Sequence, residues 1–420
     1  MQVEKMWLTA GVFTLTYIGL AVGKLPRLRC DRAAIAFIGA ALMLCLGTIS
    51  LGDAVAPDSV DYQTLFLLFG MMVVVGFLRI SGLFVRLAHW SFDRFKNPKA
   101  LLAAVVLLSG ILSAFLVNDI VCLALTPLVL HLTKRLGVNP IPHLIGLATA
   151  ANVGSTGTIT GNPQNMIIGV QSHISYASFA AHLMPVALIG LAITYGVIAI
   201  VYRAALAEAA IVSRQNGRDQ DRIPHGKYPR RLFLKSAIVA LITVILFFCR
   251  FPIALVAVGA AAFLMLSRLK PKRIYREIDW TLLLMFIGLF IVVHAFQMRV
   301  VSHWHVEQWH LILDHPVSFL SLASAALSNL VSNVPAVLLF ETIVRAVPVV
   351  NQQTAWLALA MSSTFAGNLT ILGSVANLIV VENARREGVA VSFWEYCKAG
   401  VPITVLTLAL GMGWLMVVHY

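Results

Sequence analysis

Charged residues are scarce in this chain of 420 residues, and acidic ones are the scarcest. Asp, Glu, Lys and Arg make up 12% of the sequence, 18 of them acidic and 31 basic, whereas hydrophobic residues make up 59%. Soluble domains carry about a quarter charged residues, so this composition predicts an integral membrane protein. The basic surplus does not indicate nucleic-acid binding, because the basic residues lie in short loops between apolar runs.

Cysteine is also rare, and so are patterns that hold metals or nucleotides. The five cysteines are scattered without CxxC or Cys/His ligand spacing, so neither a disulfide framework nor a zinc site is expected. The group His303, His305, Glu307 and His310 lies among tryptophans and is interpreted as an interfacial segment rather than a metal site. The segment GSTGTITG lacks the Gly-Lys-Ser/Thr ending of a phosphate-binding loop. No cofactor is expected, and no nucleophile–base pair favours an enzyme.

Two stretches place polar residues inside apolar runs, at 148–169 (ATAANVGSTGTITGNPQNMIIG) and 360–381 (AMSSTFAGNLTILGSVANLIVV). They match at one constant offset, which pairs Thr158 with Thr370, Gly161 with Gly373 and Asn165 with Asn377. Glycine and proline at mid-membrane free backbone groups, which is tolerated only where the backbone is buried in protein or lines a wet cavity. Interrupted segments at corresponding places in two halves indicate the binding site of a secondary transporter.

We place the two helix breaks at Gly161-Asn162-Pro163 and at Gly373-Ser374. Pro163 cannot donate a backbone hydrogen bond, so a break just before it follows from its chemistry. The alternative is an unbroken helix whose small residues let neighbours approach closely. The recurrence of Asn165 and Asn377 four residues after each glycine favours the breaks, whose free carbonyls and helix ends suit ions or small solutes.

The hydropathy pattern predicts an all-α polytopic membrane protein with five spans in each half. Spans are expected at 6–23, 33–51, 62–80, 140–168, 181–202, 233–249, 252–268, 280–297, 355–381 and 398–418. Residues 99–134 and 316–347 are each either two spans or one re-entrant helical hairpin, and loops of two residues favour the hairpin. The predicted organisation is a first repeat at 1–202, a linker at 203–232 and a second repeat at 233–420.

The distribution of Lys and Arg in short loops predicts the orientation. The basic linker 203–232 falls in the cytoplasm, and both termini fall outside a plasma (inner) membrane. An odd number of crossings in each half makes the two halves an inverted repeat. Matching positions support the duplication, because Asp61 and Gly70 recur as Asp279 and Gly288.

Asp119 is the one acidic residue in the first hairpin's apolar run. Burying an ionised, unpartnered carboxylate is costly, so such a residue is a functional hypothesis by default. Desolvation favours its protonated form, which suits a proton carrier. The alternative is that Asp119 caps the helix that begins at Ile120.

Three motifs carry a resemblance to a known family: SAFLVNDIVCLALTP (113–127), GSTGTITGNPQN (154–165) and SNLVSNVPAVLL (328–339). They resemble the ion transporter superfamily, and most closely its arsenite-efflux and citrate-type permease branch. The resemblance implies a scaffold, a mobile transport part with two hairpins and two broken helices, elevator-like movement and a homodimer. It also implies a first half-site with Asn118 and Gly161, a second with Asn333 and Gly373, and Asn162 and Ser374 beside the substrate.

The hairpin tips depart from the Ser-Asn-Thr of the superfamily's carboxylate transporters. This chain has Val117-Asn118-Asp119 and Ser332-Asn333-Val334 there. The lost serine and the gained aspartate favour H⁺ over Na⁺ as the coupling ion. No Lys or Arg lies in the proposed core, so a neutral or weakly acidic oxyacid, or a monovalent anion, fits better than a di- or tricarboxylate.

The sequence therefore predicts a proton-coupled secondary active transporter of a small inorganic or organic anion or oxyacid. The substrate or ion site is expected to comprise Asn118, Asp119, Thr158, Gly161, Asn162, Asn165, Ser332, Asn333, Thr370, Gly373, Ser374 and Asn377. A sodium/proton antiporter is the alternative within transport, with Asp119 and the asparagines binding the cation. A channel or an intramembrane enzyme is the alternative of another class.

Overall fold

A computed structural model describes residues 2–23, 30–87, 97–207, 229–303 and 314–418. Within these ranges every regular element is a helix. Seven of the described helices are long and apolar enough to cross a membrane.

The two halves contain the same order of helices. The first half comprises α1 (Gln2–Val22), α2 (Arg32–Cys45), α3 (Leu51–Ala54), α4 (Tyr62–Ile80), α6 (Pro98–Phe115), α7 (Asn118–Leu136), α8 (Ile141–Ser155), the 3-10 turn η1 (Ile159–Gly161), α9 (Pro163–Gln171) and α10 (Tyr176–Val201). The second comprises α12 (Arg230–Phe248), α13 (Ile253–Met265), α14 (Pro271–Tyr275), α15 (Trp280–Arg299), the 3-10 turn η2 (Val301–His303), α17 (Pro316–Val331), α18 (Asn333–Ala346), α19 (Val349–Ala366), the 3-10 turn η4 (Ile371–Gly373), α20 (Val375–Arg386) and α21 (Phe393–Val417).

The expected span at 33–51 is shorter in the structure, because α2 ends at Cys45. Gly47 adopts a left-handed conformation with φ 63°. The amides of Gly47 and Thr48 then donate back to Leu44 (3.0 Å) and Met43 (3.1 Å), which is how a glycine commonly terminates a helix. The other long spans begin and end within a few residues of their expected positions, and α4 (Tyr62–Ile80) coincides with the expected 62–80.

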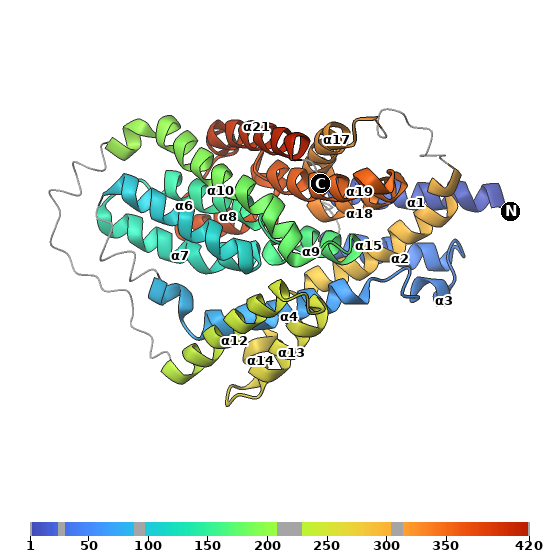
Figure 1. The fold of residues 1–420 in the computed structure, drawn as a ribbon, viewed down its shortest axis with the longest axis horizontal. Coiled ribbons are helices and arrows are strands. Elements are labelled where there is room, and N and C mark those ends of the chain that lie inside the picture. The colour runs from blue at the N-terminus through green and yellow to red at the C-terminus, as the bar shows by residue number, and fades with distance from the viewer. Residues whose placement is uncertain (1, 24–29, 88–96, 208–228, 304–313, 419–420) are drawn as a thin grey trace.

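The helices pack in two groups. The flanking group consists of α1–α4 and α12–α15, and the hairpin group consists of α6–α10 and α17–α21. Figure 1 shows α4, α12, α13 and α14 below α6, α7, α8 and α10. Helices from opposite halves of the chain pair within each group: α2 packs on α15, α13 on α4, and α7 on α20.

The flanking group is closed by two equivalent helix crossings at glycine. A Cβ atom on Gly70 of α4 would lie 2.6 Å from the backbone of Ala257 in α13, and one on Gly288 of α15 would lie 2.7 Å from the backbone of Ala36 in α2. Only a residue without a side chain permits such approach of two helix backbones. The repeated Gly70 and Gly288 of the sequence therefore mark the same contact made once by each half.

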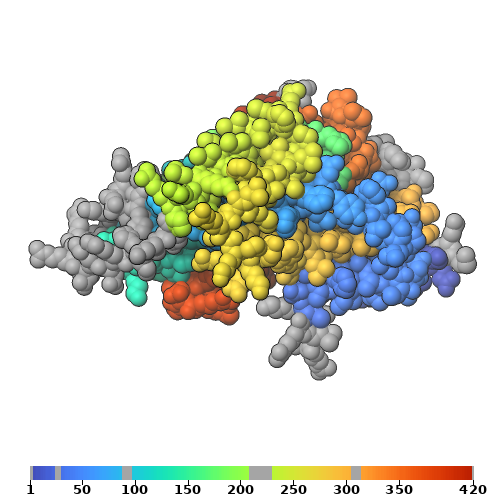
Figure 2. All heavy atoms as spheres, turned by 90° about the horizontal axis from the view of Figure 1, so that it is seen from below, coloured from blue at the N-terminus to red at the C-terminus, as the bar shows by residue number. Residues whose placement is uncertain are grey.

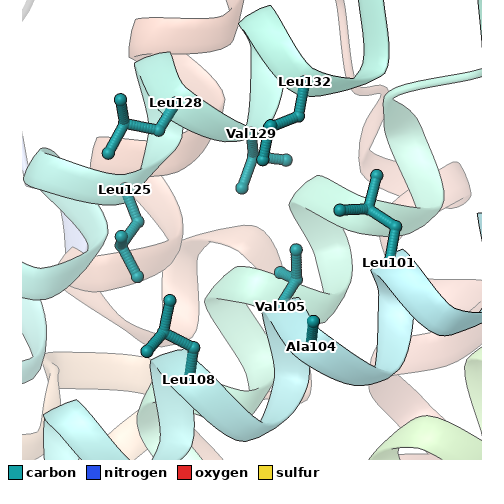
Figure 3. A pocket seen from close by; sticks show the side chains of 8 residues that line it. All are labelled: Leu101, Ala104, Val105, Leu108, Leu125, Leu128, Val129 and Leu132. Atoms are coloured by element: carbon teal, nitrogen blue, oxygen red, sulfur yellow. The ribbon is translucent and has the colours of Figure 1, made fainter. Parts of the chain in front are cut away.

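Two pairs of helices joined by short turns lie in the hairpin group, at the two interrupted apolar runs, and we call each pair a hairpin. Leu116 and Val117 join α6 to α7, and Ser332 alone joins α17 to α18. Only apolar side chains line the small cavity of about 20 Å³ between α6 and α7, which Figure 3 shows in close-up. A cavity of that size and lining does not attract a polar solute, so the candidate site lies elsewhere, at the hairpin tips.

Candidate functional site

Both predicted helix breaks are present. The α-helix stops at Ser155 and resumes at Pro163 in the first half, and it stops at Ala366 and resumes at Val375 in the second. Each break contains one 3-10 turn, and the residue before that turn is extended in both: φ −143° and ψ 165° at Thr158, φ −139° and ψ 164° at Thr370. The breaks therefore share one backbone conformation as well as one sequence pattern.

Asn165 and Asn377 hold the breaks in shape. The amide of Asn165 donates to the carbonyls of Ser155 (3.2 Å) and Thr158 (3.0 Å). The amide of Asn377 donates to the equivalent carbonyls of Gly367 (2.7 Å) and Thr370 (3.0 Å). A buried carbonyl without a partner is costly, so these asparagines satisfy the groups that the breaks release.

Both breaks require glycine, because the neighbouring backbone leaves no space for a Cβ atom. A Cβ atom on Gly161 would lie 2.1 Å from the carbonyl oxygen of Ser155. One on Gly373 would lie 2.9 Å from both the carbonyl oxygen of Gly367 and Oδ1 of Asn329. The two glycines thus let each chain fold back on the helix that precedes it.

A first cluster of buried polar side chains is centred on Asn152 of α8. Its Oδ1 accepts from Nδ2 of Asn118 (3.0 Å) and from Oγ of Ser374 (3.1 Å). Its Nδ2 donates to Oδ1 of Asn368 (2.8 Å) and of Asn377 (3.0 Å). This Asn152 cluster therefore joins the first hairpin tip to the second half's break.

A second cluster is centred on Thr364 of α19. Its hydroxyl oxygen accepts from Nδ2 of Asn162 (3.2 Å) and from Nε2 of Gln164 (3.2 Å). Asn162 also donates to Oγ of Ser155 at 2.9 Å. In the amide orientation that satisfies its neighbours, Asn333 accepts from Gln164 at 3.3 Å. This Thr364 cluster joins the second hairpin tip to the first half's break.

The two clusters occupy equivalent places in the two halves. Asn152 and Thr364 each lie in the helix before a break, at the same offset that relates Asn162 to Ser374. Asn152, Thr364 and Gln164 are absent from the site expected on sequence grounds. Asn152 and Thr364 could have been found from the repeat, because its offset pairs these two polar residues with each other.

The hairpin tips add strained and unpartnered groups to the clusters. Ser332 has φ 84°, a backbone conformation that non-glycine residues rarely adopt and that costs about 1–3 kcal/mol. Oδ1 of Asn118 is buried without a hydrogen-bond partner among the described residues. In the first break, the hydroxyl of Thr158 donates to the carbonyl of Ala114, which ties this break to its own hairpin.

Asp119 lies in the first turn of α7, next to the Asn152 cluster. Its side chain does not cap the helix, because α7 begins at Asn118 and has no side-chain cap bond, so the capping alternative is wrong. Within the described residues no hydrogen bond to its carboxylate is found.

Both clusters consist of amides and hydroxyls. Among the described residues, neither cluster contains a Lys, Arg, Asp or Glu. The side chains bond directly to one another, so a solute that binds here exchanges hydrogen bonds with neutral groups and meets no fixed positive charge. Of the histidine group considered above, His305, Glu307 and His310 lie outside the described residues.

Comparison with known proteins identifies the family. The sequence pattern of the family described as citrate transporter matches residues 17–366. The chain belongs to the citrate transporter family. It is therefore a multi-pass membrane transporter, and the resemblance to the citrate-type branch of the ion transporter superfamily is confirmed.

Curated relatives resemble the chain in sequence, and a solved structure resembles it in fold. The chain is 30% identical to the 46 kDa membrane protein of Mycobacterium leprae, over 95% of each chain. It is also 30% identical to the silicon efflux transporter LSI3 of Oryza sativa, over 96% of this chain and 95% of that protein. The crystal structure of the YdaH transporter of Alcanivorax borkumensis matches the fold with a TM-score of 0.54, at 13% identity, over 99% of this chain and 97% of that one.

Proposed function

We propose that this protein is a proton-coupled secondary active transporter of a small oxyacid that is uncharged or carries one negative charge. The observation that carries the proposal is the pair of equivalent polar clusters centred on Asn152 and Thr364. Each cluster places amides and hydroxyls at a helix break and a hairpin tip. Such discontinuous helices form the solute sites of many secondary transporters.

The chemistry of the clusters favours hydroxyl-bearing, weakly charged solutes. A tricarboxylate such as citrate would need cationic partners to offset the loss of its hydration, and the clusters supply only neutral groups. An uncharged oxyacid can exchange hydrogen bonds with Asn152, Ser374 and Thr364 at little electrostatic cost. The rice relative is named for silicon efflux, and silicic acid is a solute of this class.

The contacts between loops support an inverted repeat in the membrane. Hydrogen bonds join Arg79 to Glu277, Pro98 to His143, and Tyr202 to Glu395, all segments predicted to lie in the cytoplasm. Others join Lys5 to Gly47, Thr48 to Arg299, Asp61 to Gln171, and His182 to Trp414, all predicted to lie outside. None of these hydrogen bonds joins segments that are predicted to lie on opposite sides of the membrane. The proposed membrane is the plasma (inner) membrane, with the linker in the cytoplasm.

We propose an elevator-type movement in a homodimer, and the division into two helix groups supports the movement. The hairpin group holds both clusters, and it would carry the solute past a fixed flanking group. Asp119 follows Asn118 at the first hairpin tip, so protonation of its carboxylate would remove a negative charge from the group that carries the solute. A neutral group costs less to move through the bilayer than a charged one, so proton binding would be coupled to movement.

Sodium coupling is the competing proposal, and one observation favours it. Oδ1 of Asn118 is a buried oxygen without a partner among the described residues, and such an oxygen suits a cation that prefers oxygen ligands. In a sodium/proton antiporter this atom and Asp119 would bind the cation itself.

Reconstituted vesicles test the proposal. Purified protein in proteoliposomes is given a pH gradient, a sodium gradient or neither, and uptake of silicic acid, arsenite and citrate is measured. We expect proton-driven, saturable flux of an uncharged oxyacid and none of citrate. Citrate flux, or sodium-driven proton flux without any added oxyacid, would overturn the proposal. Flux that never saturates would point to a channel.

A further inference from the structure

A large cavity lies between the flanking group and the hairpin group, and none of the residues of the two polar clusters lines it. Its volume is about 750 Å³, within the usual range of ligand pockets. Its walls come from α4, η1, α9, α12 and α13, the turns before α10 and α13, and the first residue of α10. Figure 2 shows the face formed by α12–α14, in yellow-green and yellow, beside the blue atoms of the first helices.

The walls of this cavity are mostly apolar, and its rim opens toward the surrounding membrane. Phe247, Ile159 and Val170 line the interior. Phe66 and Leu255 stand at the rim with 56% and 72% of their surface exposed. In a protein that crosses a bilayer, exposed apolar side chains of this kind face lipid chains rather than water.

One end of the cavity carries a positive charge. Arg250 lies in the turn between α12 and α13, lines the cavity and is exposed. Its guanidinium group makes no hydrogen bond or ion pair within the part of the chain that the structure describes. His173 also lines the cavity, and none of the described lining residues is Asp or Glu. The cavity thus combines apolar walls with an exposed arginine that has no acidic partner among the lining residues.

We propose that this cavity binds an anionic phospholipid, with the phosphate at Arg250 and one acyl chain between α4, α9 and α13. The cation matches the charge of the head group, and the apolar walls match the chain. A second copy of the protein fits less well. A two-fold interface brings a patch against itself, and this patch offers Arg250 no acidic partner.

The lipid would also touch the transport machinery, a consequence that rests on the proposed function. Tyr176 lines the cavity, and its hydroxyl is hydrogen-bonded to that of Thr160 in the first break at 2.8 Å. The cavity lies between the two helix groups, so its shape must change when they slide. A bound lipid would therefore alter the rate of transport without touching the solute.

Native mass spectrometry of the delipidated full-length protein tests the binding directly. Phosphatidylglycerol and phosphatidylcholine with the same acyl chains are titrated separately. We expect one phosphatidylglycerol per chain, bound more tightly than phosphatidylcholine. Arg250→Gln should weaken phosphatidylglycerol binding about fivefold, the effect of one basic residue at a lipid surface. Val258→Trp, which fills the cavity from α13, should abolish the tight site.

Arg268→Gln is the matched control, because Arg268 is exposed at the far end of α13 and does not line the cavity. It should bind phosphatidylglycerol as the unmodified protein does. Equal binding by the unmodified protein, Arg250→Gln and Val258→Trp would overturn the proposal. The proposal would also be overturned if Val258→Trp dissociated a dimer and left lipid binding unchanged, because a second copy of the protein would then occupy the cavity. The measurement involves no transport, so failure of the proposed function would leave it intact.

Discussion

Nδ2 of Asn152 in α8 donates a hydrogen bond of 3.0 Å to Oδ1 of Asn377 in α20. The bond crosses from the first half of the chain to the second, and it links the helix before one break to the helix after the other. Asn377 meanwhile holds its own break closed through Gly367 and Thr370. A substitution of Asn152 therefore removes hydrogen bonds at both the first hairpin tip and the second break.

Removing the Asn152 side chain should damage both the fold and transport. Asn152→Ala leaves the amides of Asn118, Asn368 and Asn377 short of a partner, and each stranded buried group costs about 1–3 kcal/mol. We expect a clearly lower melting temperature and at least a tenfold loss of oxyacid flux, where about 1.4 kcal/mol corresponds to tenfold. Thermal unfolding in detergent and vesicle uptake measure the two effects.

Thr149→Ala is the control for that variant. Thr149 is also buried in α8, but its hydroxyl donates only to Ile145 within the same helix. Its loss should lower the melting temperature slightly and leave flux near that of the unmodified protein. If the two variants behaved alike, the Asn152 cluster would have no special role.

Adding one methyl group at either glycine crossing should destabilise the flanking group. Gly70→Ala and Gly288→Ala place a Cβ atom within 3 Å of the backbone of Ala257 and Ala36, and such overpacking costs about 1–3 kcal/mol. Gly259→Ala is the matched control, because a Cβ atom there meets nothing within 4 Å and alanine favours a helix by about 1 kcal/mol. Thermal unfolding should therefore show opposite shifts for the two kinds of variant.

Asp119→Asn should separate transport from the proton gradient. The substitution keeps the size of the side chain and removes its ability to release a proton, so we expect a normal melting temperature and no flux driven by pH. Asp119→Glu, which can still titrate, should retain part of that flux. Full pH-driven activity in the asparagine variant would show that another group carries the proton.

The proposed orientation predicts which cysteines are reached from outside the cell. Cys249 is exposed and lies in the turn before Arg250, on the side predicted to be external. A membrane-impermeant maleimide should label it in intact cells, and Cys249→Ser should lose that label. A cysteine introduced at the exposed Glu387, on the predicted cytoplasmic side, should react only after the membrane is permeabilised. The reverse pattern would invert the topology.

The sequence predicted the breaks because they depend on residues with unusual backbone chemistry. Pro163 lacks an amide hydrogen, and Gly161 and Gly373 lack a side chain, so their effect is local and visible in the chain. The early end of α2 was missed for the opposite reason. An apolar run continues past Cys45, and Gly47 ends the helix through its conformation rather than through a change in hydropathy.

The roles of individual polar residues were harder to predict. Asn165 and Asn377 stay predicted solute contacts, and the structure adds that their amides bond to the break carbonyls, a pairing that depends on how the chain folds back. Asn152 and Thr364 look like ordinary residues of apolar helices until a distant segment packs on them. Hydrogen bonds that join residues far apart in sequence leave no local pattern, so only the repeat offset could have revealed them.

The exchange of partners between the halves has a consequence for biosynthesis. When the first half leaves the ribosome, the helix surface at Gly70 lacks the helix that packs on it, and the side chain of Asn152 lacks its partners from the second half. The groups that cover them follow later, and Asn377 comes 225 residues after Asn152. The helices of the first half therefore enter the membrane before their packing partners exist. The interior of the protein is complete only after the helices of the second half have been translated.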